Sequence, residues 1–339
     1  MDRPRRTGPS AVRARVGAAL AAAAVVAGAP AAALAANAGS LPPSAWTAPY
    51  SLPVPRVGAA MAYDPATRQI ILFGGLDSSA PLADTWAWNG TTWVQLQPKT
   101  SPPARFFGAM TYDPATSDIV LFGGYGNSAA LNDTWLWNGT IWTQAKPKGS
   151  PPSVGGAALT YDAATKVLLL FGGNNGKNYF NTTWLFNGRA WTQAHPKSSP
   201  LPRELPTLSY DPAQRNVVLY GGADPSSTFS DTWLWNGSDW VQPKNAGSTG
   251  TRSGAAAAYD PALRSVVLFG GVRPVGKGTV QWLGDTWGWN GQTWVSLATG
   301  GAPPRAYAGA AYDAGTQALV MFGGHNAVGN LDDTWVWRP

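Results

Sequence analysis

The sequence predicts an all-β protein in which six similar units form a ring. Three observations lead to this prediction: a repeat of nearly fixed length, short β-branched and aromatic runs within each copy, and Gly-Gly or Asn-Gly pairs where those runs end. Composition agrees, because 40 glycines and 29 prolines against 12% charged residues disfavour long helices and coiled coils. With 44% hydrophobic residues, the 339-residue chain can form a substantial core.

Tyr-Asp pairs mark the repeat. Four of the five intervals between them are 49 residues long, and the last is 53. In each copy an aliphatic run ending in Gly-Gly follows the pair, and a Thr-Trp pair comes after that run. The Tyr-Asp pairs begin at Tyr63, Tyr112, Tyr161, Tyr210, Tyr259 and Tyr312.

The first half of a copy predicts two strands. In the first copy we expect strand a at residues 58–63, followed by a turn at Asp64–Thr67, whose Asp-Pro start is typical of turns. The run Ile70–Phe73 is typical of a fully buried strand b, and Gly74 and Gly75 end it.

The second half of the copy predicts a hairpin. Strand c, at Thr85–Trp88, alternates large and small side chains, and Asn89-Gly90 favours the positive φ angles of a type I′ turn before strand d around Trp93. A four-stranded sheet with two apolar faces is not stable alone, so the copies are expected to stack. A radial array of such sheets is a β-propeller.

Four-stranded blades of this period, with Gly-Gly after strand b and Trp in strand d, resemble kelch repeats. The resemblance covers residues 45–339 and implies a six-bladed kelch β-propeller. The kelch family also includes the central domain of galactose oxidase, a distant likeness, whose copper centre uses histidine and tyrosine ligands and a Tyr-Cys cross-link. This chain has no cysteine and two histidines, so we expect no cofactor and no metal site.

The ring is predicted to close through the N-terminal part of the repeat region. Six copies need six strand d tryptophans, but the chain ends at Pro339, after the sixth strand c. Trp46 lies 17 residues before Tyr63, close to the spacing found in the other copies. We therefore expect residues 45–50 to complete the last blade, which leaves no open sheet edge between the first and last blades.

The N-terminus predicts export. Five arginines precede an apolar, alanine-rich run at 16–36, which ends in the small-x-small triplet Ala33-Leu34-Ala35. We interpret residues 1–36 as a secretory signal peptide and 37–44 as a short linker; a membrane anchor is the alternative, which Pro30 disfavours. Cleavage lowers the net charge from +6 to +2. The expected product is a secreted, extracellular monomer that binds neither nucleic acid nor, after cleavage, the membrane.

One face of the propeller is expected to carry the function. The a-to-b and c-to-d turns are nearly identical in every copy, whereas the b-to-c loops and d-to-a crossovers differ between copies. We call the face formed by these variable segments the loop face. Its candidate binding residues include Tyr125, Tyr179 and Trp282, the last within a longer fifth loop at 272–284.

A near-ring of arginines is predicted on the same face. Each arginine lies seven residues before its Tyr-Asp pair, close to the expected mouth of the central channel, and Val154 replaces it in the third copy. The guanidinium groups could converge on a carboxylate-rich partner, and in the kelch adaptor proteins that the chain resembles, arginines near this position grip acidic peptides. Alternatively, each arginine could cap carbonyls of its own d-to-a crossover. The arginines are Arg56, Arg105, Arg203, Arg252 and Arg305.

The expected function is a non-catalytic binding scaffold that recognises a protein or an extracellular polysaccharide. The alternatives are a carbohydrate-active enzyme and a carbohydrate-binding lectin on the same propeller. The aspartates before the Thr-Trp pairs recur with the repeat, which favours loop hydrogen bonding over paired-carboxylate catalysis. A lectin with repeated sites requires exposed strand d tryptophans, so the burial of Trp93 and its equivalents separates these functions.

Overall fold

The computed structural model describes residues 53–276, 278–299 and 301–339. The predicted signal peptide, the linker and the closing strand at 45–50 lie outside these residues. Within them the chain forms strands and loops, and no helix is long and apolar enough to cross a membrane.

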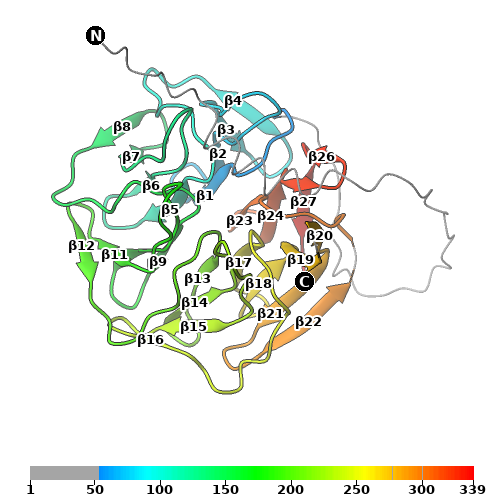
Figure 1. The fold of residues 1–339 in the computed structure, drawn as a ribbon. Coiled ribbons are helices and arrows are strands. Elements are labelled where there is room, and N and C mark those ends of the chain that lie inside the picture. The colour runs from blue at the N-terminus through cyan, green and yellow to red at the C-terminus, as the bar shows by residue number, and fades with distance from the viewer. Residues whose placement is uncertain (1–52, 277, 300) are drawn as a thin grey trace, which may run out of the picture.

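Six antiparallel sheets form a ring around a central axis, as predicted (Figure 1). Five sheets have four strands each, and the sixth has three among the described residues. Blade 1 contains β1 (Ala60–Asp64), β2 (Gln69–Phe73), β3 (Thr85–Trp88) and β4 (Trp93–Leu96). Blade 2 contains β5 (Ala109–Asp113), β6 (Asp118–Phe122), β7 (Thr134–Trp137) and β8 (Trp142–Ala145). Blade 3 contains β9 (Ala158–Asp162), β10 (Val167–Phe171), β11 (Thr183–Phe186) and β12 (Trp191–Ala194).

The remaining blades follow the same order. Blade 4 contains β13 (Thr207–Asp211), β14 (Asn216–Tyr220), β15 (Thr232–Trp235) and β16 (Trp240–Val241). Blade 5 contains β17 (Ala256–Asp260), β18 (Ser265–Phe269), β21 (Asp285–Trp289) and β22 (Trp294–Thr299). Blade 6 contains β23 (Gly309–Asp313), β24 (Ala318–Phe322) and β27 (Thr334–Trp337). Two small hairpins extend the loops of blades 5 and 6: β19 (Val272–Gly276) with β20 (Thr279–Trp282), and β25 (His325–Asn326) with β26 (Gly329–Asn330).

The first strand of each blade lines the axis, and the ring is closed. Neighbouring inner strands contact one another all the way round, from β1 through β5, β9, β13 and β17 to β23 and back to β1.

Close approach of the blades explains the Gly-Gly pairs. Gly75 N donates to the carbonyl oxygen of Arg105 in the next blade at 2.9 Å, and a Cβ on Gly74 would lie 2.4 Å from that same oxygen.

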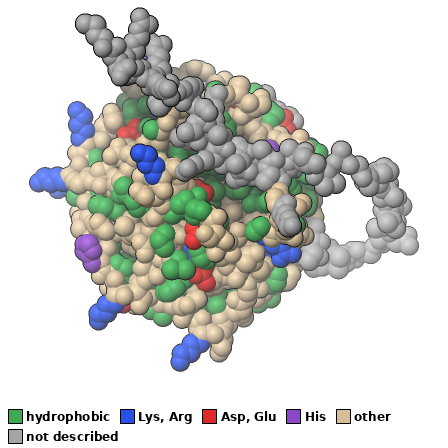
Figure 2. Space-filling view, viewed as in Figure 1, with side chains coloured by type: hydrophobic (Ala, Val, Ile, Leu, Met, Phe, Trp, Pro, Cys, Tyr) green, Lys and Arg blue, Asp and Glu red, His purple; other side chains and the backbone are tan. Residues whose placement is uncertain are grey.

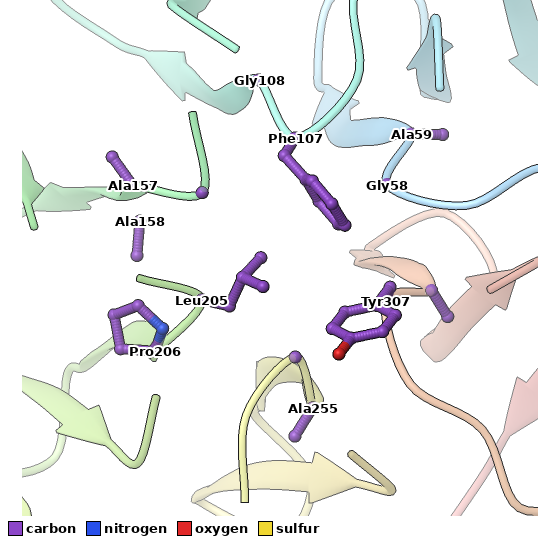
Figure 3. Close-up of a pocket in the computed structure, with 13 residues that line it drawn as sticks. Gly58, Ala59, Phe107, Gly108, Ala157, Ala158, Leu205, Pro206, Ala255 and Tyr307 are labelled. Carbon is purple, nitrogen blue, oxygen red and sulfur yellow. The ribbon is translucent and has the colours of Figure 1, made fainter. Parts of the chain in front are cut away.

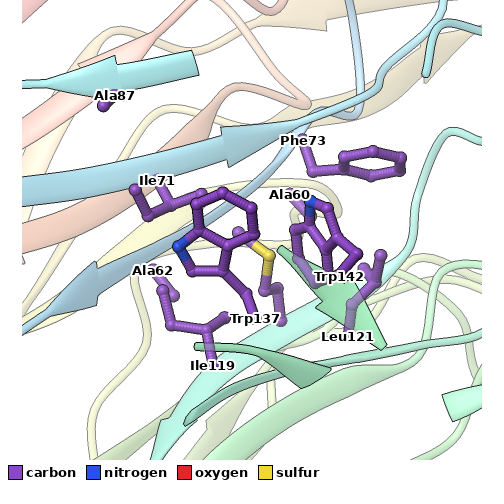
Figure 4. Close-up of a cluster of buried hydrophobic side chains, with 10 residues drawn as sticks. Ala60, Ala62, Ile71, Phe73, Ala87, Ile119, Leu121, Trp137 and Trp142 are labelled. Carbon is purple, nitrogen blue, oxygen red and sulfur yellow. The ribbon is translucent and has the colours of Figure 1, made fainter. Parts of the chain in front are cut away.

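The core consists of six clusters of buried side chains, which mainly fill the joints between blades. At the joint of blades 1 and 2, Trp142 packs edge-on against Phe73 with ring centroids 5.3 Å apart, and its Nε1 donates to Thr85 Oγ1 at 3.0 Å (Figure 4). The same Trp-to-Thr hydrogen bond occurs at four other joints. Trp93 and its four described equivalents are at most 6% exposed, so the strand d tryptophans are core residues.

Candidate functional site

A ring of six backbone hydrogen bonds surrounds the axis at the loop face. One residue from each blade has a positive φ of 51–66°, and its N–H donates to the carbonyl oxygen of the equivalent residue in the preceding blade. The six N···O distances are 2.7–3.0 Å. We call this set the mouth ring, and its members are Gly58, Phe107, Gly156, Leu205, Gly254 and Tyr307.

The mouth ring alternates between glycine and a large side chain. A Cβ on Gly58 would lie 2.6 Å from the ring of Phe107, and one on Gly254 would lie 2.2 Å from the ring of Tyr307. Each glycine is therefore covered by the side chain of the next blade. Phe107, Leu205 and Tyr307 converge on the axis around a cavity of about 130 Å³ (Figure 3), and the Phe107 and Tyr307 rings are 5.5 Å apart. These three side chains narrow the channel at the loop face.

The channel widens towards the opposite face, where the Tyr-Asp turns lie. A cavity of about 360 Å³ is lined there by Tyr63, Tyr112, Tyr161 and equivalent tyrosines, with methionine, alanine and leucine side chains between them. The lining repeats from blade to blade, as the repeat sequence requires.

The five predicted arginines are buried in ion pairs. Each is at most 1% exposed and forms a two-pronged hydrogen-bonded pair with the aspartate that precedes the Thr-Trp pair of its own blade. In the pair of Arg105 and Asp133, the N···O distances are 2.6 and 2.8 Å. Arg105 also donates to the carbonyl oxygens of Gly123 at 2.9 Å and Pro103 at 3.0 Å. The other pairs are Arg56–Asp84, Arg203–Asp231, Arg252–Asp285 and Arg305–Asp333.

This geometry supports the structural alternative for the arginines. All five guanidinium groups are occupied by carboxylate and carbonyl acceptors and offer almost no surface to a ligand. Four of the five also donate through Nε to the carbonyl two residues earlier, in the d-to-a crossover, as that alternative predicts. Burial acts to raise the pKa of Asp133, but hydrogen bonds and the charge of Arg105 outweigh it and hold this pKa below its usual range.

Blade 3 lacks both members of the pair. Val154 occupies the arginine position, and Thr182 occupies the aspartate position. In the other blades the first tryptophan of strand c donates to that aspartate, as Trp135 does to Asp133 at 2.7 Å. Trp184, its equivalent in blade 3, has a buried Nε1 without a hydrogen-bond partner among the described residues. The arginine and the aspartate thus occur together or not at all, as expected of a pair that acts as one structural unit.

A polar cluster that does not follow the repeat lies at the joint of blades 3 and 4. Its centre is the carboxylate of Glu204, the residue before mouth-ring Leu205 and the one glutamate of the chain. Asn174 Nδ2 donates to Glu204 Oε2, and Tyr179 donates to Oε1 at 3.4 Å. Tyr125 is 2% exposed, interacts with the same carboxylate and donates to the backbone oxygen of Asn174 at 3.2 Å. Burial raises the pKa of Glu204 to about 7, against the effect of these donors.

An aromatic group lies at the blade 5 and blade 6 side of the mouth. Trp282, at the end of β20, is half-buried, and its ring centroid is 5.3 Å from that of His325 and 6.3 Å from that of Tyr307. His325 Nδ1 is hydrogen bonded to Asn330 Oδ1 at 2.8 Å. The structure therefore places Tyr125 and Tyr179 together around Glu204, and Trp282 in a separate group that reaches the mouth ring through Tyr307.

Sequence reasoning missed three features of this site. It did not assign a role to Glu204, it did not single out Asn174, and it did not anticipate the mouth ring. A comparison of copies could have found the first two, because the positions equivalent to Glu204 hold valine, phenylalanine, glycine, serine and alanine. Among the described residues, no group of three or more His, Asp or Glu side chains is placed to hold a metal ion.

Comparisons with known proteins agree with the repeat. The family model of the KLHDC2/KLHL20/DRC7 Kelch-repeats domain matches residues 40–203. A search of curated proteins gave no match to the chain. The distant likeness to the galactose oxidase domain stays a prediction.

Proposed function

We propose that this chain is a kelch-repeat propeller and a non-catalytic scaffold that binds another protein at the mouth of its loop face. A general protein-binding role is typical of such propellers. The observation that carries the choice of face is the grouping of non-repeat side chains there: the cluster of Glu204, Asn174, Tyr125 and Tyr179 and the group around Trp282. A rigid ring that presents variable loops is a common arrangement for recognition.

The burial of strand d tryptophans counts against a lectin with repeated sites, since Trp93, Trp142 and their equivalents have almost no exposed ring surface to stack on a sugar. Five of the described aspartates are committed to the buried arginines and are unsuited to acid–base work. The first consideration favours a protein-binding scaffold over a lectin, and the second favours it over a carbohydrate-active enzyme.

We further propose that the protein acts outside the cell. The support is the arginine-rich, alanine-rich N-terminal segment with its small-x-small site. N-terminal sequencing of the protein recovered from culture medium tests this. A first residue near position 37 is expected, and a mature protein that retains residues 1–36 in the membrane fraction would overturn the proposal.

Affinity capture with matched surface variants tests the binding face. The wild-type propeller is compared with a Tyr179→Ala, Trp282→Ala variant on the loop face and an Ile141→Ser variant in a c-to-d turn on the opposite face. Ile141 is 37% exposed, so its replacement should not disturb the core. A partner retained by wild type and Ile141→Ser but lost by the double variant supports the proposal. A partner lost by Ile141→Ser alone would move the site to the opposite face.

A further inference from the structure

Glu204 is a carboxylate at the mouth that has no cation beside it. The five buried arginines are each paired with an aspartate, and within the described residues no lysine, arginine or histidine forms an ion pair with Glu204. Its oxygens accept from an amide and from tyrosine hydroxyls, which are neutral donors. The neutral donors therefore hold the Glu204 carboxylate in position but do not neutralise its charge. A charged donor forms a stronger hydrogen bond with a carboxylate than these neutral donors do.

The position of the carboxylate brings it to the axis. A Cβ built on Gly156, a member of the mouth ring, would lie 3.4 Å from Glu204 Oε2 and 3.3 Å from the Leu205 side chain. Because Glu204 is half-buried, part of it remains open to solvent at the loop face. An incoming side chain that reaches the mouth ring above Gly156 would meet this carboxylate.

Aromatic side chains stand close to this carboxylate. Tyr125 interacts with it directly, and the charge of Glu204 also raises the pKa of Tyr307 in the mouth ring, although burial is the larger cause. Phe107 packs edge-on against Tyr307. A carboxylate beside aromatic faces is suited to an organic cation, which gains both a charge partner and cation–π contacts.

Two other carboxylates of the loop face, Asp77 and Asp224, are less available. Asp77 accepts from the backbone N–H groups of Ser79 and Ala80, and Asp224 accepts from those of Ser226 and Ser227, so both are held in their own loops. The face of the disc seen in Figure 2 shows acidic and hydrophobic side chains near its centre and most of its Lys and Arg side chains towards the rim. An acidic, aromatic centre complements a basic group on a partner.

We propose that Glu204 is the anchor for a lysine or arginine side chain of the partner protein, which enters the mouth between Glu204 and the aromatic ring of Tyr307. This inference rests on the proposed function and specifies the chemistry of the partner. It predicts tighter binding at higher pH, because the cation binds the ionised carboxylate. The titratable groups that face Glu204 are Tyr125, Tyr179 and Tyr307, and burial raises the pKa values of Tyr125 and Tyr307. Tyr125 and Tyr307 stay neutral while Glu204 titrates.

The single glutamate of the chain makes the test direct. Protein labelled with ¹³C at the glutamate carboxyl carbon gives one glutamate signal by NMR, and its shift reports the ionisation of Glu204. The probe is N-acetyl-arginine amide, and N-acetyl-citrulline amide is its neutral counterpart of nearly equal shape. At about ten times its dissociation constant, the arginine probe should lower the apparent pKa of Glu204 by about one unit, and citrulline should leave it unchanged. Equal shifts with both probes, or none with arginine, would refute the inference.

Two variants separate this inference from the proposed function. Glu204→Gln keeps the shape and should weaken binding of the arginine probe and of the captured partner at least tenfold, whereas Asp224→Asn should bind both like wild type. The melting temperature of each variant confirms that it folds. If the captured partner binds Glu204→Gln as well as wild type but is lost by Tyr179→Ala, Trp282→Ala, the loop-face function stands and the cation anchor is refuted. If every loop-face variant retains the partner, the proposed function itself fails.

Discussion

Removing Arg105 and Asp133 singly and together tests whether the buried pairs hold the blades together. The substitutions Arg105→Val and Asp133→Thr copy the residues that blade 3 carries at these positions, Val154 and Thr182. Each single change leaves one unpaired charge in a largely buried site, since the side chains are 1% and 17% exposed. Breaking a buried pair in this way costs about 3–5 kcal/mol, and the partial exposure of Asp133 favours the lower value.

The double variant should cost much less than the sum of the single changes. It leaves no buried charge, but the carbonyl oxygens of Gly123 and Pro103 lose the arginine donor and Trp135 loses its acceptor. Three lost hydrogen bonds at about 1 kcal/mol each give about 3 kcal/mol. Two single changes at about 3 kcal/mol each would sum to about 6 kcal/mol, so we expect a coupling energy of about 3 kcal/mol.

Urea unfolding followed by tryptophan fluorescence measures these free energies. Arg273→Ala is the control, because Arg273 lies in the exposed β19–β20 hairpin and bonds to Gln281 at the surface. Its free energy of unfolding should stay close to that of wild type. If the losses of unfolding free energy in the two single variants add up to the loss in the double variant, the structural role of the Arg105–Asp133 pair is contradicted. A fully stable Arg105→Val that fails to capture the partner would restore the arginines as ligand-binding residues.

Three further predictions concern the mouth ring, the mouth carboxylate and the N-terminal segment. Gly58→Ala should destabilise the protein by at least about 1 kcal/mol more than Gly278→Ala: both glycines have a φ near 70°, but only the first Cβ would collide with Phe107. Equal losses of unfolding free energy in the two variants, measured in urea, would count against the close packing of Phe107 on Gly58 in the mouth ring. For Glu204, whose folded pKa is raised from 4.5 to about 7, wild type should lose up to about 3 kcal/mol of stability as the pH rises from 4.5 to about 7, and Glu204→Gln should not. Parallel stability curves for the two proteins would disprove this. Deleting residues 37–50 should lower the melting temperature and promote aggregation, and an unchanged melting curve would rule out closure by this segment.

The fold could be predicted because every blade repeats the same local requirements. Regular spacing of Tyr-Asp, Gly-Gly and Thr-Trp pairs fixes four strands per copy, and the hydrogen bond from Trp142 to Thr85 shows how one copy fits the next. At the joint of blades 5 and 6, the equivalent positions are Phe269 and Thr286. The sequence predicts Trp46 as their counterpart, and that part of the chain lies outside the described residues.

The site could be predicted only in part. The face was chosen from loop variability, and Tyr125 and Tyr179 were named, but their common partner Glu204 was not. Their contact joins residues from three consecutive blades, so no local spacing in the sequence indicates it. The arginines illustrate the opposite difficulty. Their recurrence with the repeat was recognised, but their burial depends on aspartates that lie 28 or 33 residues further along the chain.

The alternation of the mouth ring explains why a six-fold repeat can build a site that is not six-fold. Six large side chains cannot share one axis, and a Cβ on Gly58 or Gly254 would already overlap the aromatic ring of the next blade. Glycine in every second blade relieves this, and the large side chain of the next blade covers each glycine. Leu205 covers Gly156 with the Glu204 carboxylate beside it, whereas Phe107 and Tyr307 cover the other two glycines with aromatic rings. The three glycine positions therefore have different surroundings, and Glu204 lies beside only one of them.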